Sequence, residues 1–328
     1  MSSLLRKIKT KATWSLRDVL FFFRLRSIPK HSAGRLILVY HGVSKDARND
    51  INSRFISVAT FEQHLSYYKN NFNVVSVQDY FNGASHPDKL TIAITFDDGY
   101  LNNLQEALPL LEKYEVPATF YITTIRSAGY EIIWPDALDL YRHTGPAEFT
   151  FAAVNYTKGK HEYMSESGSL KHLLKNGDWS LKKQLTDHIL KDNRFMENTA
   201  YHAFFKLLNE EEIQELARSP WASVGSHGLY HDCWDSIPIA DVKNALQTSK
   251  MYLERVTGKP VKSLAFPDGR YTPEVVNLAE QLGFETQLAV DYLHLDDAND
   301  PRIENRMGIN PYISFNNQME CCLLYTSD

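Results

Sequence analysis

The chain has 328 residues, of which 43% are hydrophobic and 12% aromatic, and it carries a net charge of −5. This length can bury a substantial core in one large domain or two modest ones, and the composition excludes a disordered or fibrous chain. The acidic balance and the lack of a recurring aromatic and basic face predict no nucleic-acid partner. Three cysteines without metal-ligand spacing imply no disulfide framework.

The first 30 residues are basic, unlike the rest of the chain. They hold eight lysines and arginines against one acid, a net charge of +7, which leaves −12 for the remainder. Their apolar run, residues 19–23, is too short for a secretory signal or a spanning helix. We expect residues 1–32 either to rest as an amphipathic helix on an anionic membrane surface or to pack on the domain with a basic face in solvent. Both alternatives predict a cytoplasmic protein, and the first adds peripheral contact with the inner face of the membrane through residues 1–30.

Seven β-rich runs follow in chain order and alternate with helical patterns, which predicts βα units around a parallel sheet. The runs cover residues 36–40, 74–77, 91–96, 118–123, 222–225, 262–266 and 286–290. Helices are expected at 61–70 behind a capping box of Thr60 and Gln63, at 101–111, at 239–257, and from Pro273 onward behind Thr272. About seven such units predict an α/β chain folded as a barrel.

Two segments depart from this alternation. Residues 134–220 show no clear strand–helix pattern, and we expect them to form a mainly helical insertion beside one barrel strand. The predicted catalytic domain covers residues 33–315, and residues 316–328 form a tail. Residues 322–328 resemble translated adapter sequence from library preparation, so the prediction excludes them from the fold.

Acidic and histidine side chains follow the predicted strands at the point where each strand ends. Asp97 and Asp98 come directly after an apolar strand, at the edge where parallel barrels place their chemistry. Two adjacent carboxylates repel unless a cation neutralises one, which leaves the other as a base. His227 and His231, four residues apart, follow another strand and could bind the same ion from one side of a helical turn. A polar turn and a chance histidine pair are the alternatives for each motif alone, but together they favour a two-histidine, one-carboxylate metal site.

Two weaker motifs also follow predicted strands. Phe266-Pro267-Asp268-Gly269-Arg270 is a turn after the 262–266 run, and Tyr40-His41-Gly42 ends the first run. A single histidine in such a place is more often structural than catalytic. Because these turns would meet the other motifs at one face of a barrel, we expect substrate contacts from Tyr100, Pro267, Asp268 and Arg270.

The TFDDG, HxxxH and FPxG segments, in this order, resemble those of the polysaccharide deacetylases of the NodB-homology class, carbohydrate esterase family 4. The resemblance covers about residues 35–310 and implies a distorted (β/α) barrel. It also implies that Asp97 is the catalytic base and that Asp98, His227 and His231 hold a divalent metal. Zinc is the default for such ligands, and cobalt, nickel or iron would bind a similar set.

Two departures resemble the permuted poly-N-acetylglucosamine deacetylase branch. Ala265 stands where commoner members have an arginine, and their late LxH motif is absent. In the permuted branch the general-acid histidine comes from an early strand, which carries that role onto His41. Arg270 and Arg306 are both candidates to replace the missing arginine.

The resemblance implies a carbohydrate substrate and removal of N-acetyl groups from the amino sugars of a polysaccharide or a lipid-linked glycan. Two alternatives stay open at this point. The chain could remove a formyl or an O-acetyl group from a related sugar, or it could be a catalytically silent glycan-binding module.

Overall fold

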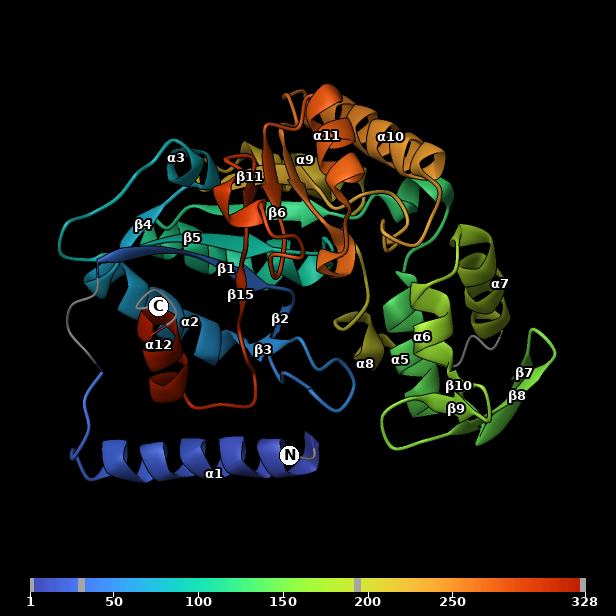
Figure 1. Ribbon diagram of the computed structural model, residues 1–328, viewed down its shortest axis with the longest axis horizontal. Helices are drawn as coiled ribbons and strands as arrows, with labels where there is room; N and C mark the ends of the chain where they lie inside the picture. Colours follow the sequence, from blue (N-terminus) through green and yellow to red (C-terminus); the bar gives the residue numbers. More distant parts are fainter. Residues whose placement is uncertain (1–2, 29–32, 192–195, 325–328) are drawn as a thin grey trace.

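A curled parallel sheet forms the centre of the computed structural model, which describes residues 3–28, 33–191 and 196–324 (Figure 1). Among the described residues, eight strands run in the order β14-β13-β12-β11-β6-β5-β1-β15, and β4 pairs with β5 beside them. Their bounds are β1 (Gly34–Tyr40), β4 (Asn73–Val75), β5 (Leu90–Phe96), β6 (Ala118–Ile122), β11 (Ala222–Ser226), β12 (Ser263–Ala265), β13 (Thr286–Leu288), β14 (Ile303–Glu304) and β15 (Met307–Gly308). The predicted α/β fold with a distorted barrel-like sheet is confirmed.

The two ends of this sheet are joined by a very short connection. β14 pairs with β13 and β15 pairs with β1, yet only Asn305 and Arg306 separate β14 from β15. This two-residue connection therefore links the two edges of the curled sheet. It also places Arg306 inside the barrel, where this residue is 1% exposed. The seven predicted runs overlap β1, β4, β5, β6, β11, β12 and β13, whereas β14 and β15 were not predicted.

The register of the strands aligns their carboxyl ends. Tyr40 pairs with Phe96, Phe96 with Phe120, and Ser226 with Ile122. All seven residues of β5 are buried, as expected for a strand covered on both faces. The residues that follow β1, β5 and β11 consequently meet at one edge of the sheet.

Helices cover the outside of the sheet. They are α2 (Val58–Asn71), α3 (Val77–Phe81), α4 (Leu108–Tyr114), α9 (Glu210–Arg218), α10 (Ile239–Thr257), α11 (Pro273–Gln281) and α12 (Phe315–Leu324). α10 and α11 lie where they were predicted. The capping prediction for α2 was wrong, because Ser57 caps this helix by accepting a hydrogen bond from the Thr60 amide. The predicted helix at 101–111 is interrupted by a π-helical turn, Asn103–Ala107.

The segment after β6 packs around a second hydrophobic cluster, which it shares with Ile51, Phe55 and Tyr100 of the barrel side. It contains α5 (Trp134–Thr144), α6 (Leu170–Lys175), α7 (Trp179–Leu190) and α8 (Thr199–His202). It also contains an antiparallel sheet that was not predicted, formed by β7 (Glu148–Phe151), β8 (Val154–Lys158), β9 (Tyr163–Ser165) and β10 (Gly168–Ser169). α9 was predicted within the insertion, but it packs on β11 and α10 of the barrel.

The remaining elements are short or lie at the chain ends. β2 (Val43–Ser44) pairs with β3 (Ile56–Ser57), and short 3₁₀ turns lie at Ile125–Ala128, Pro267–Gly269 and Asp297–Asn299. α1 (Ser3–Phe22) lies along the outside of the molecule beside α12 (Figure 1). Cys322 and Leu323 of α12, in the predicted tail, belong to the main core, and residues 325–328 lie outside the described residues. Within the described ranges, no helix combines the length and apolarity needed to cross a membrane.

Candidate active site

Asp98 occupies a strained turn directly after β5. Its φ is +74° and that of Gly99 is +82°, so two successive residues adopt the left-handed region. A Cβ at Gly99 would lie 2.9 Å from the Ile122 side chain, so glycine suits both the backbone and the space. This turn directs the Asp98 carboxylate, which is fully buried, toward the end of β11.

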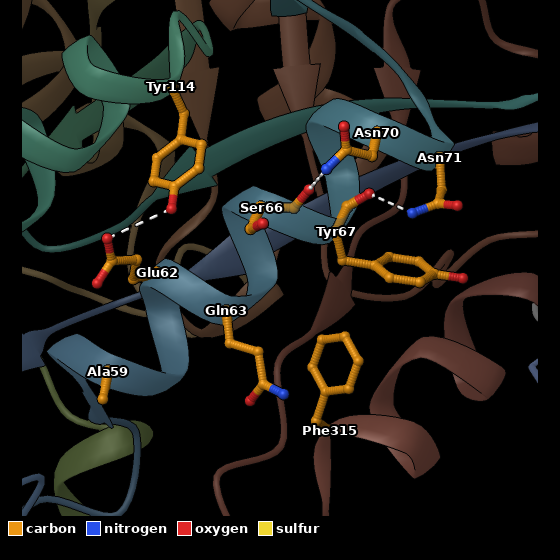
Figure 2. Close-up of a pocket in the computed structure, with 9 residues that line it drawn as sticks. All are labelled: Ala59, Glu62, Gln63, Ser66, Tyr67, Asn70, Asn71, Tyr114 and Phe315. Carbon is orange, nitrogen blue, oxygen red and sulfur yellow. Dashed lines mark hydrogen bonds between the residues drawn. The ribbon is translucent and has the colours of Figure 1, made fainter.

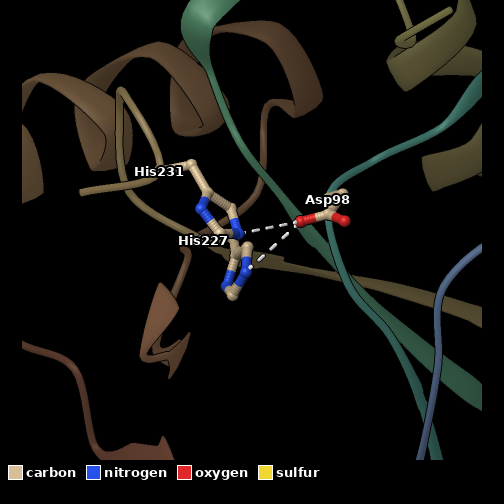
Figure 3. Close-up of side chains that lie close together, drawn as sticks. All are labelled: Asp98, His227 and His231. Carbon is tan, nitrogen blue, oxygen red and sulfur yellow. Dashed lines mark ion pairs between the residues drawn. The ribbon is translucent and has the colours of Figure 1, made fainter. Parts of the chain in front are cut away.

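His227 and His231 meet Asp98 from the loop after β11 (Figure 3). Their Nε2 atoms lie 3.5 and 3.3 Å from Asp98 Oδ1. The prediction that a helical turn would pair them was wrong, because residues 227–231 form an irregular loop in which His231 has a φ of +56°. The Trp134 indole donates a hydrogen bond to the His231 carbonyl over 2.9 Å and holds this loop.

These three side chains fit a divalent cation. Their ligand atoms all lie within 4.8 Å of one another. Asp98 Oδ1 is buried and has no hydrogen-bond partner among the described residues, which is costly unless a cation completes the site. His227 Nδ1 lies 2.9 Å from the Ala265 carbonyl, so this nitrogen carries the proton and Nε2 keeps a free lone pair. Burial lowers the pKa of His227, which also favours the neutral, ligating form.

Asp97, the preceding residue, forms a bidentate ion pair with Arg306. The two guanidinium–carboxylate distances are 2.7 and 2.8 Å, and Arg306 also donates to Thr95 Oγ1 and to the Ala289 carbonyl. Burial raises the pKa of Asp97, but the Arg306 guanidinium, with smaller contributions from His227 and His41, holds this pKa below its usual value. Asp97 is therefore ionised and oriented, with Oδ2 3.9 Å from His227 Nε2.

The second carboxylate oxygen of Asp98, Oδ2, belongs to a buried network of hydrogen bonds. Asp98 Oδ2 accepts from Arg54 Nη1 at 3.1 Å and from the Tyr100 hydroxyl at 3.0 Å. Arg54 and Asn52 also donate to Asp136, and Asp136 Oδ2 lies 2.7 Å from the same Tyr100 hydroxyl, whose single hydrogen the two carboxylates share. Burial raises the pKa of Asp98 and Arg54 opposes it, with a net pKa well below the usual value. Asp98 is thus a carboxylate with one oxygen fixed and the other free.

His41 follows β1 on the same edge of the sheet and is partly exposed. Its carbonyl accepts a hydrogen bond from Asn103 over 2.7 Å. Burial of the ring lowers the pKa of His41 to about 4, and the positive charges of Arg54 and Arg306 act in the same direction. The imidazole is consequently neutral near pH 7.

The four predicted substrate contacts occupy two different places. Tyr100 is fully buried and its hydroxyl serves Asp98 and Asp136, so the geometry assigns it to the support of the metal ligand. Pro267 is buried, and Asp268 at the adjacent turn pairs with Lys175 of α6. Arg270 binds Asp235, Asn176 and Ser236. Asp268 and Arg270 thus link the barrel to the insertion, and their contact with a substrate stays a prediction.

A surface hollow of about 490 Å³ lies elsewhere, on the outer face of α2 (Figure 2). Its lining residues are Ala59, Glu62, Gln63, Ser66, Tyr67, Asn70, Asn71, Tyr114 and Phe315. The amides of Asn70 and Asn71 bind carbonyls of their own helix, and Glu62 pairs with Lys113. With its single carboxylate already paired, this hollow lacks the free acid–base groups that hydrolysis needs.

Sequence reasoning missed Arg54, Asn52 and Asp136, and it named Arg306 only as one of two candidates. Arg54 and Asn52 lie in an irregular loop, and Asp136 opens the insertion, so no motif marked them. Arg306 lies between two strands of two residues each, which are too short to show alternation. The positions of these four residues in the site are set by contacts between segments far apart in the sequence.

A family model and a curated relative both match part of the chain. The sequence model of the polysaccharide deacetylase family matches residues 84–287, more than half of the chain. YxkH of Bacillus subtilis (strain 168), which carries the same family description, is 31% identical over 90 residues, covering 26% of this chain. The chain matches only 30% of the length of this curated relative.

Solved structures share the fold at low sequence identity. The Streptococcus pyogenes deacetylase PplD in complex with acetate has a TM-score of 0.56 and 17% identity, over 90% of this chain and 98% of that one. The de-N-acetylase from Aggregatibacter actinomycetemcomitans has a TM-score of 0.53 and 18% identity, over 86% and 97%.

Proposed function

Because the chain belongs to the polysaccharide deacetylase family, a family of hydrolases, we propose that it removes N-acetyl groups from the amino sugars of a glycan in a metal-dependent reaction. The observation that carries the proposal is that the two adjacent carboxylates make different contacts. Asp98 turns a free oxygen toward two histidine nitrogens, whereas Asp97 is paired with Arg306 and stays available as a base.

Asp98, His227 and His231 would hold the cation. When bound, a divalent cation supplies a Lewis acid that polarises a carbonyl and lowers the pKa of water. Zinc suits two imidazoles and a carboxylate, and cobalt, nickel and iron are the alternatives.

In the proposed reaction, Asp97 accepts a proton from the water that attacks the acetyl carbon. Arg306 keeps Asp97 ionised and fixes the direction of its oxygens. The carbon–nitrogen bond then breaks, and the leaving amine needs a proton. His41 is proposed to deliver it. Because its pKa of about 4 leaves the ring neutral, His41 must first receive the proton that Asp97 took from the water, and this transfer returns Asp97 to the carboxylate form. Acetate and a free amino sugar are the products.

The substrate proposal is an N-acetylated amino sugar within a polysaccharide or a lipid-linked glycan. The name of the Aggregatibacter protein, a de-N-acetylase, supports the N-acetyl choice. The same residues would also serve removal of a formyl or an O-acetyl group, because the water and base act on any of these carbonyls.

The test measures product release by purified protein from N-acetylglucosamine oligomers, an N-formyl analogue and an O-acetylated glycan. Acetate released from the first substrate, and lost in Asp97→Asn, would support the proposal. Formate or ester cleavage alone would replace N-deacetylation by one of the alternatives. If no substrate reacts although the protein binds metal and glycan, the silent binding module would be the better account.

A further inference from the structure

The N-terminal helix α1 docks on the body of the protein through charged and polar groups. Arg17 lies 3.3 Å from Glu320, and Arg26 Nε donates to the same carboxylate over 2.8 Å. Asp18 accepts a hydrogen bond of 2.7 Å from Asn317 of α12. Glu320 is only 2% exposed, so these contacts fix α1 in a defined orientation.

Within residues 13–25, whose side chains the structure describes, the outward side of α1 and of the turn after it carries large apolar side chains, which reverses the usual arrangement of a surface helix. Five large apolar side chains of this segment are half exposed or more: Leu16, Val19, Phe22, Phe23 and Leu25. Phe22 and Phe23 are 79% and 64% exposed. In Figure 1 none of the other described helices and strands lies over the side of α1 that faces away from α12. Helical spacing places residues 16, 19 and 23 opposite residues 14, 17, 18 and 21.

The helix end gathers three of these side chains in one place. Arg24 adopts the left-handed region with a φ of +55°, and the Leu25 amide donates to the Leu20 carbonyl. This is a Schellman-type ending, which turns the chain back toward α12 and leaves Phe22, Phe23 and Leu25 exposed at the turn. Arg26 then returns to Glu320.

Charge identifies what covers this apolar face. Residues 1–30 carry +7, and the exposed aromatic cluster is part of this segment. Contact with a second copy through the same face would bring two such cationic segments together, which is unfavourable. An anionic lipid surface instead offers hydrocarbon for the apolar side chains and negative headgroups for the bases. α1 is not apolar enough to span a bilayer, so it would lie in the plane of the interface.

We propose that α1 and the turn after it form a membrane-docking surface for anionic lipid, with Leu16, Val19, Phe22, Phe23 and Leu25 inserted at the headgroup boundary. The Arg17–Glu320 and Arg26–Glu320 ion pairs hold this surface against α12 of the barrel domain. The enzyme would thereby be held peripherally on a membrane.

Sedimentation with phosphatidylcholine vesicles, with and without phosphatidylglycerol, tests this proposal on the full chain. The variants are Phe22→Ser/Phe23→Ser, which removes inserted area, and Lys7→Gln/Lys9→Gln/Lys11→Gln, which removes charge. Met251→Ser is the matched control, because Met251 is an exposed apolar residue (70%) on α10. Thermal unfolding and acetate release confirm that each variant is folded.

The wild-type protein and Met251→Ser should bind the anionic vesicles equally, and less as salt is raised. We expect binding to fall at least about tenfold in the phenylalanine variant and about fivefold for each lysine removed. Absence of vesicle binding, or equal binding by Phe22→Ser/Phe23→Ser, would overturn the proposal. A dimer in light scattering that the phenylalanine variant abolishes, without vesicle binding, would overturn it in favour of a second copy.

Discussion

Replacement of Arg306 by methionine would leave the Asp97 carboxylate buried without its partner. Arg306 makes both hydrogen bonds to Asp97 and is 1% exposed, so no solvent can substitute for it directly. Removing one partner of a buried ion pair typically costs about 3–5 kcal/mol. The free energy of unfolding of Arg306→Met at pH 7 should therefore fall by about 3 kcal/mol.

The same change alters catalysis in a defined direction. Arg306 is the main group that lowers the pKa of Asp97, and burial acts against it. Without Arg306 this pKa rises, at about 1.36 kcal/mol of lost interaction for each unit. A base works only as the carboxylate, so activity is present above its pKa and lost below it. The acid limb of the pH–rate profile should move to higher pH, and activity at pH 7 should fall.

Urea unfolding and pH–rate profiles check both effects. Arg302→Met is the matched control, because Arg302 pairs with Asp300 and Glu280 at the surface and should contribute less than about 1 kcal/mol. Arg306→Met/Asp97→Asn should recover part of the lost stability, since the unpaired charge is gone. An Arg306→Met enzyme with wild-type activity and an unmoved acid limb would refute the reasoning.

Three further predictions concern buried or half-buried titratable groups. Burial lowers the pKa of His64 from 6.5 to about 4, so between these pH values the unfolded state binds more protons and the free energy of unfolding falls as the pH falls. In His64→Gln the fall in the free energy of unfolding between pH 7 and 4.5 should be smaller by about 2–3 kcal/mol. An unchanged fall, measured by urea unfolding, would contradict this. His41→Asn should slow acetate release by about 10²–10⁴-fold with metal content unchanged. In the wild-type protein the His41 ring should still be neutral at pH 6 in an NMR titration, and a midpoint near 6.5 would disprove the lowered pKa. Lys182→Met leaves Asp232 buried and unpaired, so thermal and urea unfolding should show a loss of about 3 kcal/mol that Lys182→Met/Asp232→Asn largely restores; no loss in the single variant would count against the pair.

The motif residues at strand ends could be predicted because sheet geometry gathers them. Once β5 and β11 are recognised as parallel strands, Asp98 and His227 must lie at the same edge. The strands were recognisable because β1 and β5 are seven residues long and carry long apolar runs, with the last five residues of β1 and all of β5 buried. Local sequence and global position therefore agree for this part of the site.

The residues that hydrogen-bond to these motif residues could not be predicted in the same way. Arg306 reaches Asp97 across 209 residues of chain, and Asp136 reaches Arg54 across 82. Such pairs depend on how the curl closes and where the insertion packs, and no local pattern records either. The antiparallel sheet of the insertion was missed for a related reason: β9 and β10 have three and two residues, too few to show alternation.

The most direct test of the account compares two neighbouring substitutions, Asp97→Asn and Asp98→Asn, for metal content and acetate release. After chelation and dialysis against zinc, Asp97→Asn should bind metal like the wild-type protein but release acetate about 10²–10⁴-fold more slowly. Asp98→Asn should lose both metal and activity. Wild-type turnover by Asp97→Asn, or wild-type metal affinity in Asp98→Asn, would contradict the proposed division between base and ligand.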